Sequence, residues 1–212
     1  IAGLFAVFSP SLVADDAVHV LIWDERQPAQ LQVYSNYLGE QIAGALRTCE
    51  GIEVRSVSQD DDNQGLSEEN LDWADVLIWW GHVRQAEITP EVVRERIVSR
   101  ILVGELSLIA LHSAHWSTPF MECMNERTRR DARERYPNVE GQPEVVFEFI
   151  DSPGRMSPSY DSLVTPAYYA LKSGGHVGQV RVDLPNCSFP AYRPDGAPST
   201  VTVRMPDHPI AA

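Results

Sequence analysis

Chemically active side chains gather directly after three apolar runs of this sequence. The runs are residues 18–23 (VHVLIW), 75–80 (DVLIWW) and 106–111 (LSLIAL). The residues that follow are Asp24, Glu25 and Arg26 after the first run, Gly81, His82 and Arg84 after the second, and His112, Ser113, His115 and Trp116 after the third. If the runs are neighbouring parallel strands, their carboxyl ends meet at one edge of a sheet, where open α/β sheets bind ligands. The sequence therefore predicts one crevice formed by residues 24–26, 81–84 and 112–116.

The histidines of this crevice allow two kinds of chemistry. His112 and His115 have the HxxH spacing, and His82 would add a third nitrogen to complete a zinc or similar divalent-metal site with an open fourth position. No HExxH helix accompanies them, so the alternative is that the rings only form hydrogen bonds. In either case a histidine, or a metal held by histidines, polarises a hydroxyl or carbonyl group while Glu25 or another imidazole moves a proton.

Two further features of the crevice concern nucleophilic and binding residues. Ser113 follows its predicted strand where a nucleophile elbow would lie, but His112 and Ala114 replace the glycines of GxSxG, which leaves serine catalysis as a minor alternative. Aromatic walls beside polar groups suit the apolar face and hydroxyl edge of a sugar ring. The predicted substrate-binding residues are Trp23, Asp24, Arg26, Trp80, Gly81, Arg84 and Trp116. Of the adjacent carboxylates Asp24 and Glu25, we expect at most one to face the crevice, while the other caps a turn or faces solvent.

The elements that position these residues follow from periodicity. Residues 17–104 alternate between short apolar runs and helical spacing, which is typical of βαβ units around a parallel sheet. A flavodoxin-like order places the first strand beside the third and the third beside the fourth. Helices are predicted at 31–47, 67–73, 90–103 and from 118 into the charged stretch 125–135, with further strands at 52–57, 145–150 and 177–184. Residues 136–199 contain two stretches rich in Pro, Ser and Gly, 152–166 and 185–199, and are predicted to be an irregular insertion or an α+β elaboration on the sheet.

The composition limits the partners. The 212 residues carry 17 Lys and Arg against 30 Asp and Glu, a formal net charge of -13, which disfavours nucleic acids and anionic lipid surfaces. Residues 1–16 begin with a short apolar run interrupted by Pro10 and predict the remainder of a signal peptide, hence an exported protein, periplasmic or extracellular, that is free of the membrane after cleavage. The loop-like ending MPDHPIAA predicts that a C-terminal segment follows in the complete protein.

Several strings resemble the ThuA-like, or trehalose utilisation, family. They are WDERQPAQ at 23–30, ADVLIWWGHVRQAEI at 74–88, LSLIALHSAHWS at 106–117 and DHPIA at 207–211. The resemblance extends over about residues 18–130 and the end of the chain, and implies one ThuA-like domain over 17–212 with a subgroup-specific insertion at 136–199. It implies a flavodoxin-like three-layer sandwich, similar to class I glutamine amidotransferases. Because position 113 is Ser and not the elbow cysteine, amidotransferase activity is not implied.

The resemblance also implies a role in carbohydrate metabolism, because the family is associated with the uptake and breakdown of trehalose, related disaccharides and their keto derivatives. The positions that match its motifs are Trp23, Glu25, Trp80, Gly81, His82, His112, Ser113 and His115. Two family histidines are missing, one at Gln85 and one in the NYLGEQ segment, which reduces the set of metal ligands. The expected partner is a small saccharide. An enzyme with hydrolase, lyase or isomerase chemistry, a non-catalytic saccharide-binding module and a scaffold domain remain the three hypotheses.

Overall fold

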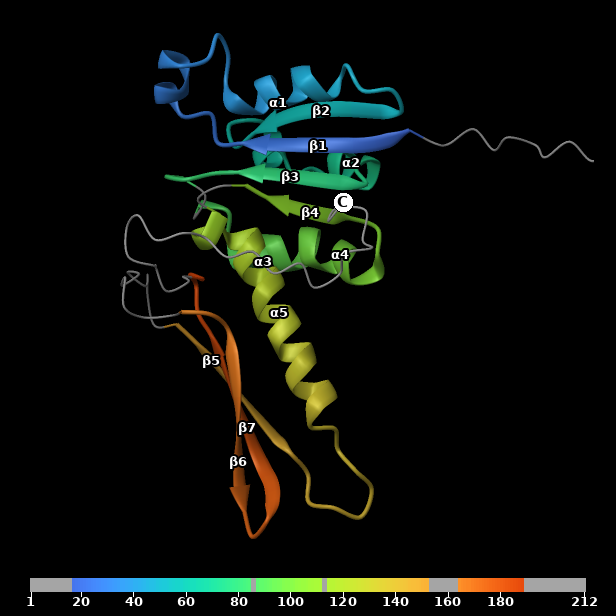
Figure 1. Cartoon of the computed structure of the whole chain (residues 1–212), viewed down its shortest axis with the longest axis vertical. Coiled ribbons are helices and arrows are strands. Elements are labelled where there is room, and N and C mark those ends of the chain that lie inside the picture. Colours follow the sequence, from blue (N-terminus) through green and yellow to red (C-terminus); the bar gives the residue numbers. More distant parts are fainter. Residues whose placement is uncertain (1–16, 85–86, 112–113, 153–163, 189–212) are drawn as a thin grey trace, which may run out of the picture.

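The first of two sheets is parallel and contains the three predicted site-bearing strands. The structure, a computed structural model, describes residues 17–84, 87–111, 114–152 and 164–188. The strands β1 (Val18–Asp24), β2 (Ile52–Ser58), β3 (Val76–Trp80) and β4 (Ser107–Ala110) pair in the order β2-β1-β3-β4 (Figure 1). The predicted α/β class, and the neighbours predicted for the first, third and fourth strands, are confirmed.

Successive side chains of a strand point to opposite faces, and in β1 and β3 both faces pack against helices. Leu21 and Trp23 of β1 pack with Leu77 of β3 in a core that extends to the helices α2 (Glu68–Trp73) and α3 (Pro90–Val93). The other face is formed by Val20, Ile22 and Ile78, which pack against Ala43, Ile42 and Leu46 of α1 (Leu38–Leu46). β1 and β3, which are buried on both faces, therefore read as near-continuous apolar runs, whereas β2 (IEVRSVS) alternates.

The helices α2 and α3 begin at a side-chain cap. The Ser67 hydroxyl accepts a hydrogen bond from the Asn70 N–H at 3.2 Å at the start of α2. The Thr89 hydroxyl accepts one from the Val92 N–H at 3.5 Å ahead of α3. The helix that begins at α3 continues through a π-helical turn, η4 (Arg94–Val98), into α4 (Ser99–Val103) and ends at Gly104, whose φ of 82° is left-handed. The π-helical turn leaves no mark in the apolar spacing and was not predicted.

The first predicted helix is divided. Residues 31–47 contain the end of a 3₁₀ turn, η1 (Pro28–Gln32), and α1, separated by a polar stretch that includes Ser35 and Asn36. Asn36 accepts a hydrogen bond from the Tyr37 N–H at 2.8 Å, a local contact that competes with helical bonding. The prediction of one continuous helix was therefore wrong.

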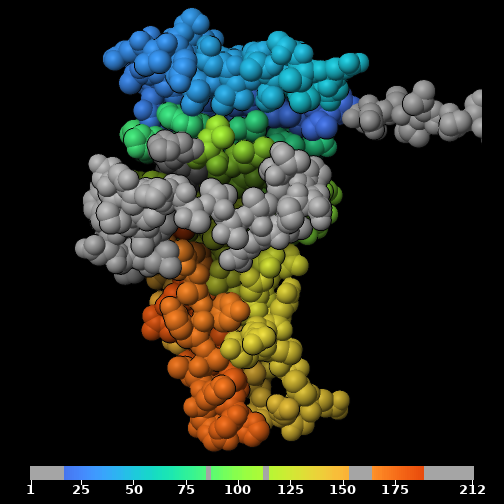
Figure 2. Space-filling view, in the orientation of Figure 1, coloured from blue at the N-terminus to red at the C-terminus, as the bar shows by residue number. Residues whose placement is uncertain are grey.

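The second sheet lies beside the long helix α5 (Thr118–Arg135), which leads away from the first sheet (Figures 1 and 2). It contains β5 (Val146–Asp151), β6 (Ala167–Ser173) and β7 (His176–Leu184) in the order β5-β7-β6. Its core is Val180, Val182 and Leu184 packed against Ala132 of α5. Strands β5 and β7 match predictions, whereas β6 was not predicted. All three lie within 136–199, whose interpretation as an insertion stays a prediction.

Within the described ranges, no helix is both long and apolar enough to cross a membrane. The predicted leader, residues 1–16, and the chain end from 189 to 212 lie outside the residues that the structure describes.

Candidate functional site

A cavity of about 430 Å³ lies where the loop after β3, the start of α3, the first half of α5 and the ends of β5 and β7 meet. Its volume is within the range of about 300–1,000 Å³ that is usual for small-molecule sites. The lining residues are His82, Val83, Pro90, Glu91, Arg94, Trp116, Thr118, Met121, Glu122, Asn125, Asp151, Ser152, Leu184, Pro185 and Asn186. The cavity therefore combines the carboxyl edge of the first sheet with residues from the second.

Three residues of the predicted crevice, His82, Val83 and Trp116, line this cavity together. His82 is exposed and Trp116 is half-buried. His115 precedes Trp116 in the short helix η5 (Ala114–Trp116), with the two ring centroids 4.8 Å apart, but it does not line the cavity.

The predicted metal site depends on a residue that the structure does not describe. His112, like Ser113, lies outside the described residues. Among those that are described, no three His, Cys, Asp or Glu side chains are arranged to hold a metal ion. Metal binding by His82, His112 and His115, and nucleophilic catalysis by Ser113, therefore stay predictions.

Glu25 anchors the loop after β3. Its side chain is 0% exposed, and its carboxylate accepts hydrogen bonds from the backbone N–H groups of His82 at 2.8 Å, Val83 at 2.8 Å and Arg84 at 3.0 Å. The Gln27 side-chain amide donates a further hydrogen bond to the same carboxylate. Every oxygen of Glu25 is thus occupied by the loop that carries His82, which makes it a positioning residue and contrasts with the predicted role in proton transfer.

The ionisation of Glu25 follows from these contacts. Burial raises the pKa of the carboxyl group, whereas the hydrogen bonds from Gln27 and from the backbone of Val83, His82 and Arg84 lower it. The hydrogen bonds outweigh burial, so the pKa of Glu25 lies below its ordinary value of 4.5. The group is therefore a permanent anion near neutral pH and an unsuitable proton donor.

Asp24 fixes the start of α1. It is fully buried, and its carboxylate accepts hydrogen bonds from the Gly39 N–H at 2.6 Å, the Gln30 side-chain amide at 3.1 Å and the Arg26 N–H at 2.8 Å. The Arg26 guanidinium lies 5.7 Å from the centroid of the Tyr37 ring. Neither the Asp24 carboxylate nor Arg26 lines the cavity, in contrast to their predicted binding roles.

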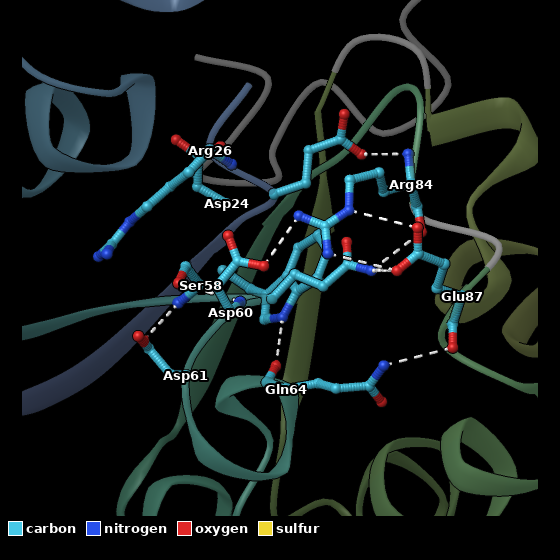
Figure 3. Close-up of polar contacts among 11 residues, drawn as sticks. Asp24, Arg26, Ser58, Asp60, Asp61, Gln64, Arg84 and Glu87 are labelled. Carbon is cyan, nitrogen blue, oxygen red and sulfur yellow. Dashed lines mark hydrogen bonds and ion pairs between the residues drawn. The ribbon is translucent and has the colours of Figure 1, made fainter. Parts of the chain in front are cut away.

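Arg84 forms ion pairs and is not in the cavity lining. Its guanidinium reaches Asp60 at 2.9 Å and Glu87 at 3.3 Å (Figure 3). The hydrogen bonds to Glu87 and then to Asp60 raise the pKa of Arg84 above its ordinary value. Arg84 therefore connects the turn after β2 with the segment before α3. It is not among the residues that would contact a substrate in the cavity.

The remaining predicted binding residues lie in or near the core. Trp23 is 0% exposed, stacks on Trp79 with a centroid distance of 3.7 Å, and donates its indole N–H to the Gln64 carbonyl at 2.8 Å. This burial leaves no face of Trp23 for a sugar ring. Trp80 is half-buried and Gly81 buried at the end of β3, and neither lines the cavity.

Most of the lining residues were not predicted from the sequence, and the charged ones on α3, η4 and α5 form a connected group. Glu122 is 7% exposed and pairs with Arg94 at 3.0 Å, while Arg94 also reaches Glu91 at 2.9 Å. Asn125 is 4% exposed and donates a hydrogen bond from its side-chain amide to the Pro185 carbonyl at 3.3 Å. Glu122 and Asn125 stand three positions apart on one face of α5. The spacing of Glu122 and Asn125 is visible in the sequence. The charged residues that follow in the same helix prevent its buried face from being identified by apolar periodicity.

No protein-family model matches the chain, and no curated protein matches it.

Proposed function

We propose that this chain is a carbohydrate utilisation protein of the ThuA-like type that binds a saccharide in the cavity beside His82 and Trp116. The observation that carries the proposal is that these two side chains, from separate loops at the carboxyl edge of a parallel sheet, line one cavity of about 430 Å³. The order β2-β1-β3-β4 supports the finer fold assignment, because it is the beginning of the flavodoxin-like order.

The chemistry of the lining suits a sugar. Trp116, Met121 and Pro90 provide apolar surface, against which the C–H face of a pyranose packs. Glu122 and Asp151 provide carboxylate oxygens that accept hydrogen bonds from hydroxyl groups. An apolar wall with a few convergent acceptors is the usual construction of a site for small polar molecules.

If the protein is an enzyme, His82 is the group that we expect to transfer a proton. Its imidazole is exposed at the cavity, and its backbone is held by Glu25 through the 2.8 Å hydrogen bond. Among the described residues of the predicted catalytic set, His82 alone lines the cavity. A neutral imidazole there accepts a proton from a sugar hydroxyl, or as imidazolium returns one to a leaving oxygen, in hydrolase, lyase or isomerase chemistry.

A saccharide-binding module is the second candidate. The hydrogen bonding of Glu25 favours this candidate. The Glu25 carboxylate accepts hydrogen bonds from backbone N–H groups, so it is not available to His82 as a catalytic partner. In the module, His82 and Trp116 only hold the sugar.

The test compares turnover and affinity for trehalose and its 3-keto derivative in the wild type and in His82→Ala. If the protein is an enzyme, the turnover of His82→Ala is expected to fall at least about 100-fold, which is the usual contribution of a general acid or base. His176→Ala, in which the changed residue is exposed at the start of β7 and outside the cavity lining, is the matched control and keeps wild-type turnover. Affinity without turnover in the wild type identifies the module, and absence of both contradicts the proposal.

A further inference from the structure

We infer that the cavity takes an uncharged saccharide and rejects its phosphate ester, with Asn125 as the residue that selects a ligand hydroxyl. This inference rests on the proposed function and specifies its substrate class. Two features of the lining carry it, namely a buried amide oxygen without a donor and a surplus of carboxylates.

The first feature is the side-chain carbonyl of Asn125. Its amide nitrogen donates to the Pro185 carbonyl, and this contact fixes which end of the amide is the oxygen. The oxygen Oδ1 is buried and has no hydrogen-bond donor among the residues that the structure describes. A buried acceptor without a donor is unfavourable and rare in folded proteins.

Asn125 is a lining residue of the cavity, so a ligand hydroxyl would supply the missing donor when ligand binding exposes Oδ1, which is buried in the unliganded chain. Thr118, Met121 and Glu122 lie on the same face of α5 and line the cavity as well. A hydroxyl group donates to an amide oxygen, whereas the oxygens of an ionised phosphate only accept. Asn125 therefore distinguishes between these two groups at the same position.

The second feature is the charge of the lining. The described lining residues include the three carboxylates of Glu91, Glu122 and Asp151, but a single guanidinium, that of Arg94. Arg94 is already engaged by two of these carboxylates, Glu91 at 2.9 Å and Glu122 at 3.0 Å. A phosphate would have to displace one of these partners and would face the remaining carboxylates.

The whole chain adds to this repulsion, since its formal net charge is -13. Discrimination of this kind comes from an unfavourable interaction with the wrong ligand and does not require a stronger interaction with the right one. The phosphate ester is thus excluded by the same acceptors that bind hydroxyl groups.

The experiment is isothermal titration of the whole chain with trehalose and with trehalose 6-phosphate. The wild type is expected to bind trehalose at least about tenfold more tightly, which corresponds to one unfavourable charge contact. Asn125→Leu, which keeps the size of the side chain and removes the acceptor, is expected to weaken trehalose binding about tenfold.

A charge variant tests the second feature separately. Glu122→Gln removes one carboxylate. It is expected to reduce the ratio of the affinities for trehalose and trehalose 6-phosphate by at least about threefold. Glu126→Gln is the matched control, because Glu126 is on the same helix, pairs with Arg129 and does not line the cavity. It is expected to keep the wild-type preference. If Asn125→Leu fails to fold, the comparison of Glu122→Gln with Glu126→Gln still tests whether the carboxylates of the lining disfavour the phosphate ester.

The outcomes separate this inference from the proposed function. Equal or tighter binding of trehalose 6-phosphate by the wild type overturns the inference and leaves the proposed function standing. The same holds if a folded Asn125→Leu binds trehalose as the wild type does. If neither sugar binds, the proposed function and the inference both fail.

Discussion

Adjacent carboxylates at the end of β1 have different tasks, and both tasks concern the positions of backbone segments. Asp24 holds the first turn of α1, and Glu25 holds the loop after β3. Each is buried and each is satisfied by N–H donors, so neither is free to react. At the scale of single residues, the edge of the sheet is stabilised by buried anions that pair with backbone amides.

We expect Glu25→Gln to lower the free energy of unfolding by about 2 kcal/mol, the usual contribution of hydrogen bonds to a charged group. The amide removes the charge and turns one acceptor into a donor that faces backbone N–H groups. Chemical denaturation measures the change. Glu50→Gln, at an exposed position, is the control, and its expected change is within about 0.5 kcal/mol. Equal stability of the two variants would contradict the anchoring role.

The same residue predicts a pH dependence. Its pKa in the folded chain lies below 4.5, the ordinary value that applies to the unfolded chain. The stabilisation by Glu25 is therefore complete above that pH and is lost as the pH falls through the folded pKa. The difference in unfolding free energy between wild type and Glu25→Gln, followed from about pH 7 to about pH 3, should stay constant and then decrease. A difference that grows on acidification would show that the sign is wrong.

Sequence reasoning located His82 and Trp116 because the ends of parallel strands lie together. It did not find the role of Glu25, whose partners are backbone N–H groups 57 to 59 positions away and leave no trace in side-chain types. It did not find Asn125 either, because this buried residue lies within the polar string NERTRRDARER.

At the scale of elements, the start of α1 is determined from outside the helix. Its N-cap, Tyr37, offers no side-chain hydrogen bond. Instead the Gln30 side-chain oxygen accepts from the Leu38 N–H at 2.8 Å, and Asp24 accepts from the Gly39 N–H at 2.6 Å. A β-carbon at Gly39 would lie 2.8 Å from the Asp24 β-carbon, so only glycine permits this approach.

Substituting two glycines of the same helix tests this arrangement. Gly39→Ala is expected to lower the free energy of unfolding by about 1–3 kcal/mol because of the steric conflict with Asp24. Gly44→Ala, where an added β-carbon meets nothing within 4 Å, is expected to raise it by about 0.5–1 kcal/mol. Thermal or chemical unfolding of both variants gives the comparison. Changes of the same sign would contradict the account of the α1 start.

Elements with local signals were predictable, and elements that depend on tertiary contacts were not. The caps at Ser67 and Thr89 and the stop at Gly104 are encoded within a few residues. The strand β6 has a weak apolar pattern and obtains its bonds from the antiparallel β7 across the turn at Gly174 and Gly175. Its existence depends on that pairing and not on its own composition.

At the scale of the whole molecule, α5 joins the two sheets. Its first half packs on α3 and η4 and lines the cavity, while Ala132 in its second half is 0% exposed against the core of the second sheet. The cavity therefore depends on the position of the second sheet as well as on the first.

A charge placed at Ala132 should destabilise the second sheet more than the first. Ala132→Asp buries an unpaired carboxylate and is expected to reduce amide hydrogen-exchange protection in β5, β6 and β7 more than in β1 and β3. Glu134→Asp introduces the same residue at an exposed position of α5 and is expected to leave both sheets protected. Uniform loss of protection across both sheets in Ala132→Asp would show that they do not differ in this way.

The most direct test of the central claim is a crystal structure of the protein with trehalose. We expect sugar density in the cavity, with a pyranose face against Trp116 and a hydroxyl within hydrogen-bond distance of Asn125 Oδ1. Sugar bound at a different place, or a cavity that stays empty at saturating trehalose, would contradict it.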